Sequence, residues 1–373
     1  MLLRTFGWSF GITLLGLAAA AYFWGADGFG IVLILSILEI SLSFDNAVIN
    51  ATVLKRMNPF WQRIFLTVGV LIAVFGMRLI FPLLVVALTA HIGPQTVVSL
   101  ALDSSKTYNG LTYAQHLEAA HPAIAAFGGT FLLMIFLDFI FGEKEIRWLE
   151  PLERPLEKIG KLDQLSVVVA LTVLMLSARF FAGDHAETVL LAGVAGLTTY
   201  LAVSGLSSLF EAEGDEEAEE EAESQASGRP AKSAVQVAGK AAFFLFMYLE
   251  VLDASFSFDG VVGAFAITQD IFQITLGLGI GAMYIRSLTV YLVRQGTLDD
   301  YVYLEHGAHY AIGALAFILM VSIKYSIPEV VTGLIGVTFI GLALVSSILR
   351  NRREGGDGDD PAELDAPSGV ARL

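Results

Sequence analysis

The chain has 373 residues, of which 55% are hydrophobic and 16% charged, and its mean hydropathy is +0.68. Soluble globular domains carry about 25% charged residues, so this composition indicates a membrane protein. The chain contains no cysteine, which excludes disulfides, thiolate metal sites and thiol redox chemistry. Much of the formal net charge of −15 comes from two acidic runs, at residues 211–223 and 357–365. No basic groove accompanies them, so we expect no nucleic-acid partner.

Ten hydrophobic stretches are long enough to cross about 30 Å of hydrocarbon. They occupy residues 7–24, 29–52, 64–90, 123–142, 165–182, 187–210, 236–264, 271–293, 307–325 and 328–349. The sequence therefore predicts an all-α polytopic membrane protein with about 9–10 transmembrane helices. The first stretch follows Arg4 and ends near Ala18-Ala19-Ala20, a pattern that also fits a cleaved signal peptide.

The distribution of Lys and Arg between the loops predicts the orientation of the spans. With the N-terminus in the cytoplasm, most of the 22 basic residues fall on the cytoplasmic side. Lys106, Arg179 and Lys324 fall on or near the outer side, and Arg78 and Arg286 lie within spans. We therefore expect a multi-pass protein of the plasma (inner) membrane with both termini in the cytoplasm. Cleavage of the first span would place the N-terminus outside.

Two acid-bearing segments within the spans are copies of each other. The first is Glu39-Ile-Ser-Leu-Ser-Phe-Asp45-Asn46-Ala-Val48, and the second is Asp253-Ala-Ser-Phe-Ser-Phe-Asp259-Gly260-Val-Val262. The predicted topology runs the two segments in opposite directions, so we predict two membrane halves of inverted topology. The predicted units are an N-terminal span or signal anchor (1–28), a first membrane half (29–210), an acidic cytoplasmic linker (211–234), a second half (235–350) and a disordered acidic cytoplasmic tail (351–373).

Inverted repeats place a shared site near the membrane midplane, at the interface of the halves. A carboxylate at the centre of a membrane helix costs about 2.5–3.5 kcal/mol, so a chain that carries one in two matching places is expected to hold a cation. The candidate metal ligands are Glu39, Asp45, Asn46, Glu250, Asp253 and Asp259, and the candidate auxiliary residues are Ser43, Ser257, Arg78, Arg286 and Asp138. This all-oxygen set suits hard divalent cations such as Mn²⁺, Mg²⁺ and Ca²⁺.

Charge and helix geometry constrain this site. One divalent ion cannot neutralise all the carboxylates, so we expect protonation, or pairing with the two mid-span arginines, to neutralise the others. A purely structural role, in which the acids tie helices together through those arginines, is the alternative. A straight helix places Glu39, Ser43 and Asn46 on one stripe and turns Asp45 about 120° away. Either the second acid of each copy faces the bundle by another surface, or the helix unwinds locally, which Gly260 and the serines would ease.

Polar residues elsewhere have more ordinary expected roles. We expect the outer loop at 91–122, with His91, His116 and His121, to be solvated, and the cytoplasmic loop at 143–163 to be a connector at the lipid headgroups. Asp138 either snorkels to the inner interface or serves ion exit.

The paired segments resemble the TerC/Alx family of integral membrane proteins, within the larger lysine-exporter-like superfamily. The resemblance rests on Glu39-x-x-x-Ser43-x-Asp45-Asn46 and on the copy at 253–259, and it covers residues 29–349. It implies export of metal ions, chiefly Mn²⁺, with the acids and Asn46 as ion ligands. This chain departs from the pattern at Gly260, which stands where the first copy has Asn46, and in carrying Glu250 one turn before Asp253. It therefore resembles a divergent branch.

The leading hypothesis is a transporter that exports a divalent cation, foremost Mn²⁺, by alternating access. No nucleotide motif is present, so we expect a proton gradient to drive it. The alternatives are an assembly or insertion factor for other membrane proteins, and an exporter of an organic cation such as an amino acid. The spans contain no His-assisted or Ser-based catalytic set, so we expect no enzyme activity and no prosthetic group. The expected partners are the lipid bilayer and the ion; protein partners and oligomeric state stay open.

Overall fold

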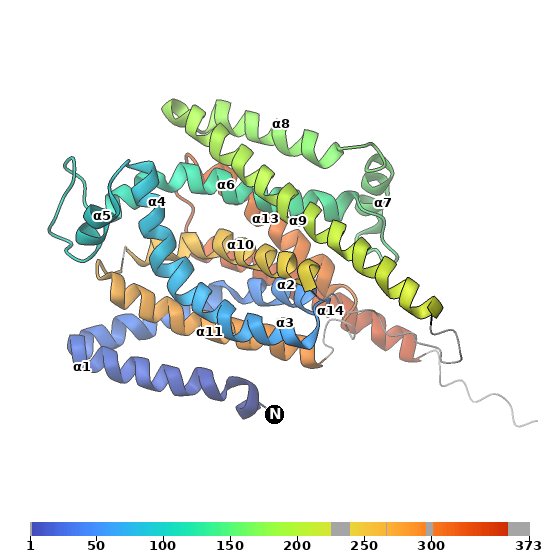
Figure 1. Cartoon of the computed structure of the whole chain (residues 1–373), viewed down its shortest axis with the longest axis horizontal. Helices are drawn as coiled ribbons and strands as arrows, with labels where there is room; N and C mark the ends of the chain where they lie inside the picture. The colour runs from blue at the N-terminus through green and yellow to red at the C-terminus, as the bar shows by residue number, and fades with distance from the viewer. Residues whose placement is uncertain (1, 225–238, 266, 296–300, 357–373) are drawn as a thin grey trace, which may run out of the picture.

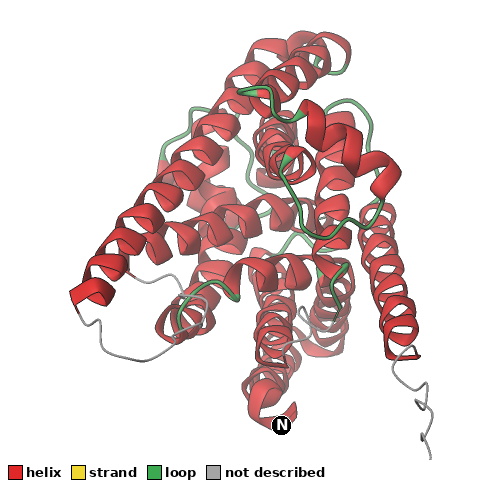
Figure 2. Cartoon of the chain, turned by 90° about the vertical axis from the view of Figure 1, so that its right-hand side faces the viewer, coloured by secondary structure: helices red, strands yellow, loops and turns green. Residues whose placement is uncertain are grey.

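The computed structural model describes residues 2–224, 239–265, 267–295 and 301–356, and these ranges contain helices and no strand (Figures 1 and 2). Eight helices are long and apolar enough to cross a membrane, and Leu165–Phe180 adds a shorter apolar helix. The expectation of an all-α, multi-pass membrane protein is therefore confirmed.

The elements follow one another in this order: α1 (Leu2–Leu42), α2 (Phe44–Leu54), α3 (Pro59–Ile64), the π-helices η1 (Phe65–Gly69) and η2 (Ile72–Ile80), α4 (Phe81–Thr89), α5 (Pro94–Ala101), α6 (Tyr113–Phe141), α7 (Glu150–Ile159), α8 (Leu165–Phe180), the 3₁₀ turn η3 (Gly183–His185), α9 (Ala186–Ser224), α10 (Gly239–Ala264), α11 (Ile271–Gln295), α13 (Leu304–Ser322) and α14 (Glu329–Gly356).

Helix α1 consists of two arms that reverse direction at Gly25, whose φ of 72° is readily adopted only by glycine (Figure 1). The first arm packs along α11: Ser9 Oγ lies 2.9 Å from Ser287 Oγ, and Trp24 Nε1 donates to Asp270 Oδ2 at 2.8 Å. The first predicted span is therefore the first arm of α1, which packs against the bundle, and the second predicted span (29–52) comprises the second arm of α1 and most of α2.

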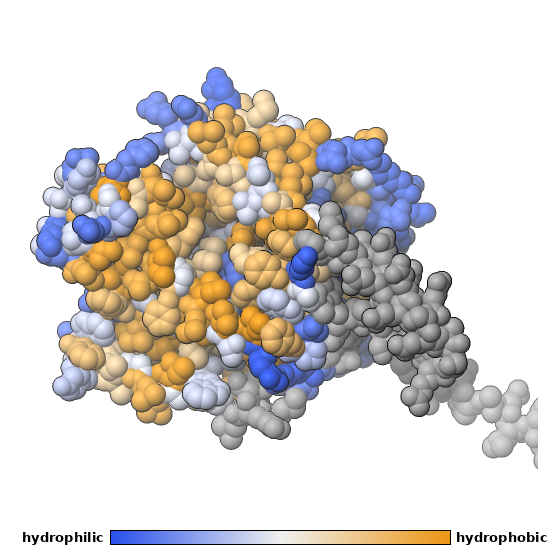
Figure 3. Space-filling view, viewed as in Figure 1, coloured by the Kyte–Doolittle hydropathy of each residue, from blue (hydrophilic) through white to orange (hydrophobic). Residues whose placement is uncertain are grey.

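On the face shown in Figure 3, an apolar belt crosses the middle of the molecule between hydrophilic patches at two opposite ends. Helices α5 and α7 mark these ends (Figure 1), which we call the α5 end and the α7 end. The turn between α8 and α9 lies at the α5 end, whereas the connections on either side of α7 lie at the α7 end. This arrangement is the one expected for helices that cross a bilayer.

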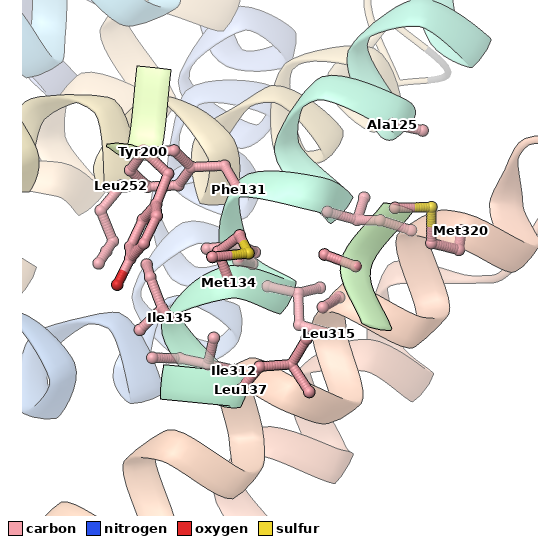
Figure 4. Close-up of a cluster of buried hydrophobic side chains, with 14 of the residues drawn as sticks. Ala125, Phe131, Met134, Ile135, Leu137, Tyr200, Leu252, Ile312, Leu315 and Met320 are labelled. Atoms are coloured by element: carbon pink, nitrogen blue, oxygen red, sulfur yellow. The ribbon is translucent and has the colours of Figure 1, made fainter. Parts of the chain in front are cut away.

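Helix α6 lies at the centre of the bundle and packs against α9, α10 and α13. Its buried side chains Phe131 and Met134 meet Leu252 of α10 and Leu315 of α13 in one cluster (Figure 4). This packing holds the second half of the chain against the first.

The structure corrects the predicted outer loop. Helix α6 begins at Tyr113 rather than near residue 123, because Thr112 and Gln115 form a capping box that starts the helix early. His116 is consequently buried, with Nε2 3.0 Å from the Tyr108 carbonyl oxygen. The expectation of a fully solvated loop is wrong for His116.

The structure adds detail to the predicted acidic linker and to the loop at 143–163 that was predicted to be cytoplasmic. The backbone of α9 continues to Ser224, so the first part of the acidic linker is helical, as its many Ala and Glu residues permit. Helix α14 continues to Gly356, so the first residues of the predicted disordered tail (351–373) are helical. Residues 225–238 and 357–373 lie outside the described ranges. In the loop at 143–163, the carboxylate of Glu153 is fully buried. It accepts hydrogen bonds from the Trp148 and Leu149 N–H groups and from Tyr310 Oη. This connector is therefore anchored to α13 as well as lying at the surface.

Candidate functional site

The two acid-bearing segments lie side by side and run antiparallel. A β-carbon on Gly260 would lie 3.3 Å from Glu39 Oε2, and Asn46 Nδ2 donates to Asp253 Oδ1 at 3.0 Å. Leu54, further along the first segment, packs in one cluster with Leu245, which precedes the second. Rising numbers on one segment therefore meet falling numbers on the other, which is the relationship that inverted topology predicts.

Glu39 is buried and forms a salt bridge with the buried guanidinium of Arg78. Ser43 Oγ donates to the same carboxylate oxygen at 3.2 Å. Arg78 lies on η2, and its NH1 also donates to the Ala73 carbonyl oxygen at 2.6 Å. π-Helical turns are rare and are frequently found at functional sites. The π-helical winding of η1 and η2 beside these groups is therefore consistent with a functional role for this region.

The second copy forms a matching pair. Arg286 of α11 donates to both carboxylate oxygens of Glu250, at 3.0 and 3.1 Å, and to Asp253 Oδ2 at 3.5 Å. The guanidinium also lies 4.2 Å from the centre of the Phe65 ring, so a cation–π contact adds to the ion pairs. In each half, an acid on one helix is thus bonded to an arginine on a following helix.

The two pairs form one electrostatic network. The hydrogen bond from Asn46 ties Asp253 to the first segment, and Arg78 lies close enough to interact electrostatically with Asp253 and Glu250 as well as with Glu39. Among the described side chains of this network, the buried acids are Glu39, Glu250 and Asp253 and the buried bases are Arg78 and Arg286. With all of these groups ionised, the network carries a formal excess of one negative charge.

Two glycines allow the close approach on which this network depends. A β-carbon on Gly281 of α11 would collide with Cβ and Cγ of Glu39, and one on Gly69 would collide with Arg286 NH1. No other residue leaves this space open, so these glycines set how near α11 and η1 come to the acids.

The backbone differs between the two copies. Helix α1 ends at Leu42 and α2 begins at Phe44, with Ser43 (φ −99°, ψ 17°) between them. Of the two predicted alternatives, the first copy therefore shows a local break in the helix. In the second copy α10 continues as a helix through Gly260 to Ala264, so no unwinding occurs there.

A cavity of about 550 Å³ leads to the first copy. Glu39, Ser43, Asn46 and Gly260 line it among largely apolar side chains of α1, α10, α11 and α13. Glu118, which is exposed near the start of α6, also lines it, so the cavity extends towards the α5 end. A polar group or ion entering from that end would meet Glu39, Ser43 and Asn46.

The family model described as "Protein of unknown function (DUF475)" matches residues 44–354, which include α2 and all of the second half. The chain belongs to this family. No curated protein and no solved structure matches the chain.

The structure of this DUF475 member separates the predicted ligands into groups. Glu39 and Asn46 face the cavity, whereas Glu250 and Asp253 are bonded to Arg286 and do not line it. Ser257 is buried on α10, one turn after Asp253. The side chains of Asp45 and Asp259 lie outside the described residues. Among the side chains that are described, no three Asp, Glu or His groups are placed to hold a metal ion together.

Asp138 lies apart from the paired segments. Tyr200 Oη donates to its carboxylate at 2.6 Å, and both residues line a second cavity of about 280 Å³, together with Arg56 in the connection after α2. This cavity therefore lies towards the α7 end.

Three positions of the site were missed by the sequence interpretation. Phe65 has no distinguishing signal, because only the packing of α11 brings it to the acids. Gly281 ends the glycine-rich stretch 277–281, which indicates close helix packing but not which residue lies opposite. Asn50 does have one: it lies four residues after Asn46 within a hydrophobic span, so it extends the polar stripe of Glu39, Ser43 and Asn46.

Proposed function

We propose that this protein is a secondary transporter that exports a divalent cation, with Mn²⁺ as the foremost candidate. The observation that carries the proposal is the cavity that leads from the α5 end to Glu39, Ser43 and Asn46, beside a network with excess negative charge. Carboxylate, hydroxyl and amide oxygens are the ligands that hard divalent cations prefer. The resemblance of the paired segments to the TerC/Alx family supports the same choice of ion.

The charge balance suggests how binding proceeds. Arg78 occupies one side of Glu39, so an arriving cation competes with this guanidinium for the carboxylate. We propose that Asp45 and Asp259, which belong to the same two segments, supply further carboxylates. These would allow the cation to compete with Arg78 for Glu39. Protons that leave these acids when the metal binds would couple its export to a proton gradient.

The orientation follows from the basic residues. The connections at the α7 end carry Arg56, Lys144, Arg147 and Lys161, among others. We therefore place the α7 end in the cytoplasm, with the protein in the plasma (inner) membrane. The cavity at Glu39 then faces the outside, so this conformation is the one from which an exported ion would leave.

The size of the cavity supports one alternative. About 550 Å³ falls in the range of pockets that hold small organic molecules. An organic cation such as an amino acid is therefore the second candidate substrate, and its ammonium group would take the place proposed for the metal beside Glu39.

The test is transport by purified protein in proteoliposomes under an imposed proton gradient, with Mn²⁺, Mg²⁺, Ca²⁺, Zn²⁺, Co²⁺ and cationic amino acids scanned in turn. Asp45→Asn, Asp259→Asn and Glu39→Gln remove one carboxylate each. Glu187→Gln, at an exposed position at the start of α9, is the matched control.

We expect Mn²⁺ flux in the wild type and in Glu187→Gln, and its loss in the three site variants. Flux of an amino acid without metal flux would favour the organic substrate. Absence of any flux from folded protein would overturn the transporter proposal and favour a role in membrane-protein assembly.

A further inference from the structure

Helix α2 passes between the two cavities. Asn46, near its start, lines the cavity that extends towards the α5 end, whereas Thr52 and Val53, near its end, line the cavity towards the α7 end. The part of α2 between these residues is buried, and it therefore separates the two cavities.

Asn50 lies in this barrier. Its side chain is fully buried, and neither Nδ2 nor Oδ1 has a hydrogen-bond partner. Buried amides are nearly always bonded, and an apolar residue of the same size would fit without loss of a bond. A buried amide without a protein partner is a place where a water molecule or an ion can bind.

The position of Asn50 places this amide between the two cavities. Asn46 and Asn50 are four residues apart on a continuous helix, so they lie on the same face of α2, one turn from each other. The next position on this face is Val53, at the wall of the α7-end cavity. The polar face of the α1–α2 segment thus runs from Glu39 in one cavity through Asn46 and Asn50 towards the other.

The α7-end cavity has chemistry that suits a cation. Asp138 presents a carboxylate to it, oriented by the hydrogen bond from Tyr200, and Glu305 adds a second acid on α13. Arg56 and His309 line the same cavity and offset part of its negative charge.

We propose that the α7-end cavity is the second vestibule of the transport path and that Asn50 is the ligand a cation meets between the two vestibules. This inference rests on the proposed transport function and deepens it. The Asn50 Oδ1 oxygen takes a place among the ligands of a passing hard cation, and Nδ2 donates to one of the waters that accompany it. In the conformation described here the barrier is closed, and the amide has no partner.

The decisive comparison is between Asn50→Leu and Thr130→Val in the same proteoliposome assay with Mn²⁺. Thr130, on α6, is also fully buried with an unbonded hydroxyl, so its replacement controls for removal of a buried polar group as such. We expect Asn50→Leu to lower Mn²⁺ flux by about tenfold or more, the scale of one lost polar contact, with unchanged melting temperature. Thr130→Val should keep wild-type flux.

The chain has no cysteine, so labelling of a single introduced cysteine provides a second test, which can still be carried out if Asn50→Leu folds poorly. We expect Asn50→Cys to react slowly with a water-soluble methanethiosulfonate reagent and to react faster when Mn²⁺ is added. Wild-type flux in Asn50→Leu, or a labelling rate that Mn²⁺ leaves unchanged, would overturn the inference and leave the proposed function standing. Absence of flux of any ion in the wild type would overturn both.

Discussion

Asn46 donates a hydrogen bond to Asp253 across 207 positions of the chain, and this bond joins the two acid-bearing segments at the centre of the bundle. Around it, Glu39 is bonded to Arg78 and Asp253 to Arg286. Most buried acids of this site are thus already neutralised in the absence of an ion. Under the proposed transport function, a cation that binds these carboxylates has to displace an arginine, so the strength of these pairs would affect transport.

The Glu39–Arg78 pair should reveal this strength in a double-mutant cycle. Removal of either partner leaves a buried charge unpaired, so Glu39→Leu and Arg78→Met should each destabilise the protein by about 3–5 kcal/mol. The double variant should lose less than the sum, because no charge of the pair remains. Thermal unfolding in detergent measures all three. The exposed Arg154–Glu150 pair, at 3.8 Å, is the matched control and should show coupling near zero. Additive effects at Glu39 and Arg78 would contradict the pairing.

Gly281 should tolerate no side chain. A β-carbon there meets Cβ and Cγ of Glu39, so Gly281→Ala must push α11 away from the acids and should cost about 1–3 kcal/mol through overpacking. Mn²⁺ flux should fall with it, because Glu39 moves. Gly341→Ala, on α14 with no atom within 4 Å of the added carbon, should be neutral or slightly stabilising. Equal melting temperatures of the two variants would show that α11 is not held against Glu39.

The α7 connector should open in acid. Arg147 donates to both carboxylate oxygens of Glu157, at 2.8 and 3.0 Å, and this pairing holds the pKa of Glu157 below its ordinary value. Because the pKa of Glu157 is lower in the folded state than in the unfolded state, the Arg147–Glu157 pair stabilises the fold fully above the unfolded pKa. This stabilisation is lost as the pH falls through the folded pKa.

Hydrogen exchange of residues 143–163 over an acidic pH series, corrected for intrinsic rates, measures this effect. We expect protection to fall at low pH in the wild type and the pH-dependent part to vanish in Glu157→Gln. Glu150→Gln, on the same helix, should keep the wild-type profile. Identical profiles for all three proteins would rule out the Arg147–Glu157 pair as the cause.

The local features of this protein follow from its sequence alone. Long apolar stretches must become helices in a membrane, because every backbone polar group needs a partner there. The duplicated Glu39 and Asp253 segments, together with the mid-span positions of Arg78 and Arg286, were sufficient to predict a shared central site. The spacing of Glu39, Ser43 and Asn46 also predicted the stripe that faces the cavity, because helical periodicity is a local property.

The partners of these residues were decided by the tertiary structure. Which arginine neutralises which acid depends on how α11 and η2 pack, and that packing depends on Gly69 and Gly281, whose role is visible only when a neighbouring helix is in place. The burial of His116 and Glu153 likewise arises from contacts with distant or folded-back segments. The place of Asn50 between two cavities is also a property of the assembled bundle. The sequence shows an amide in a hydrophobic helix, and only the packing of the bundle buries this amide where it has no hydrogen-bond partner.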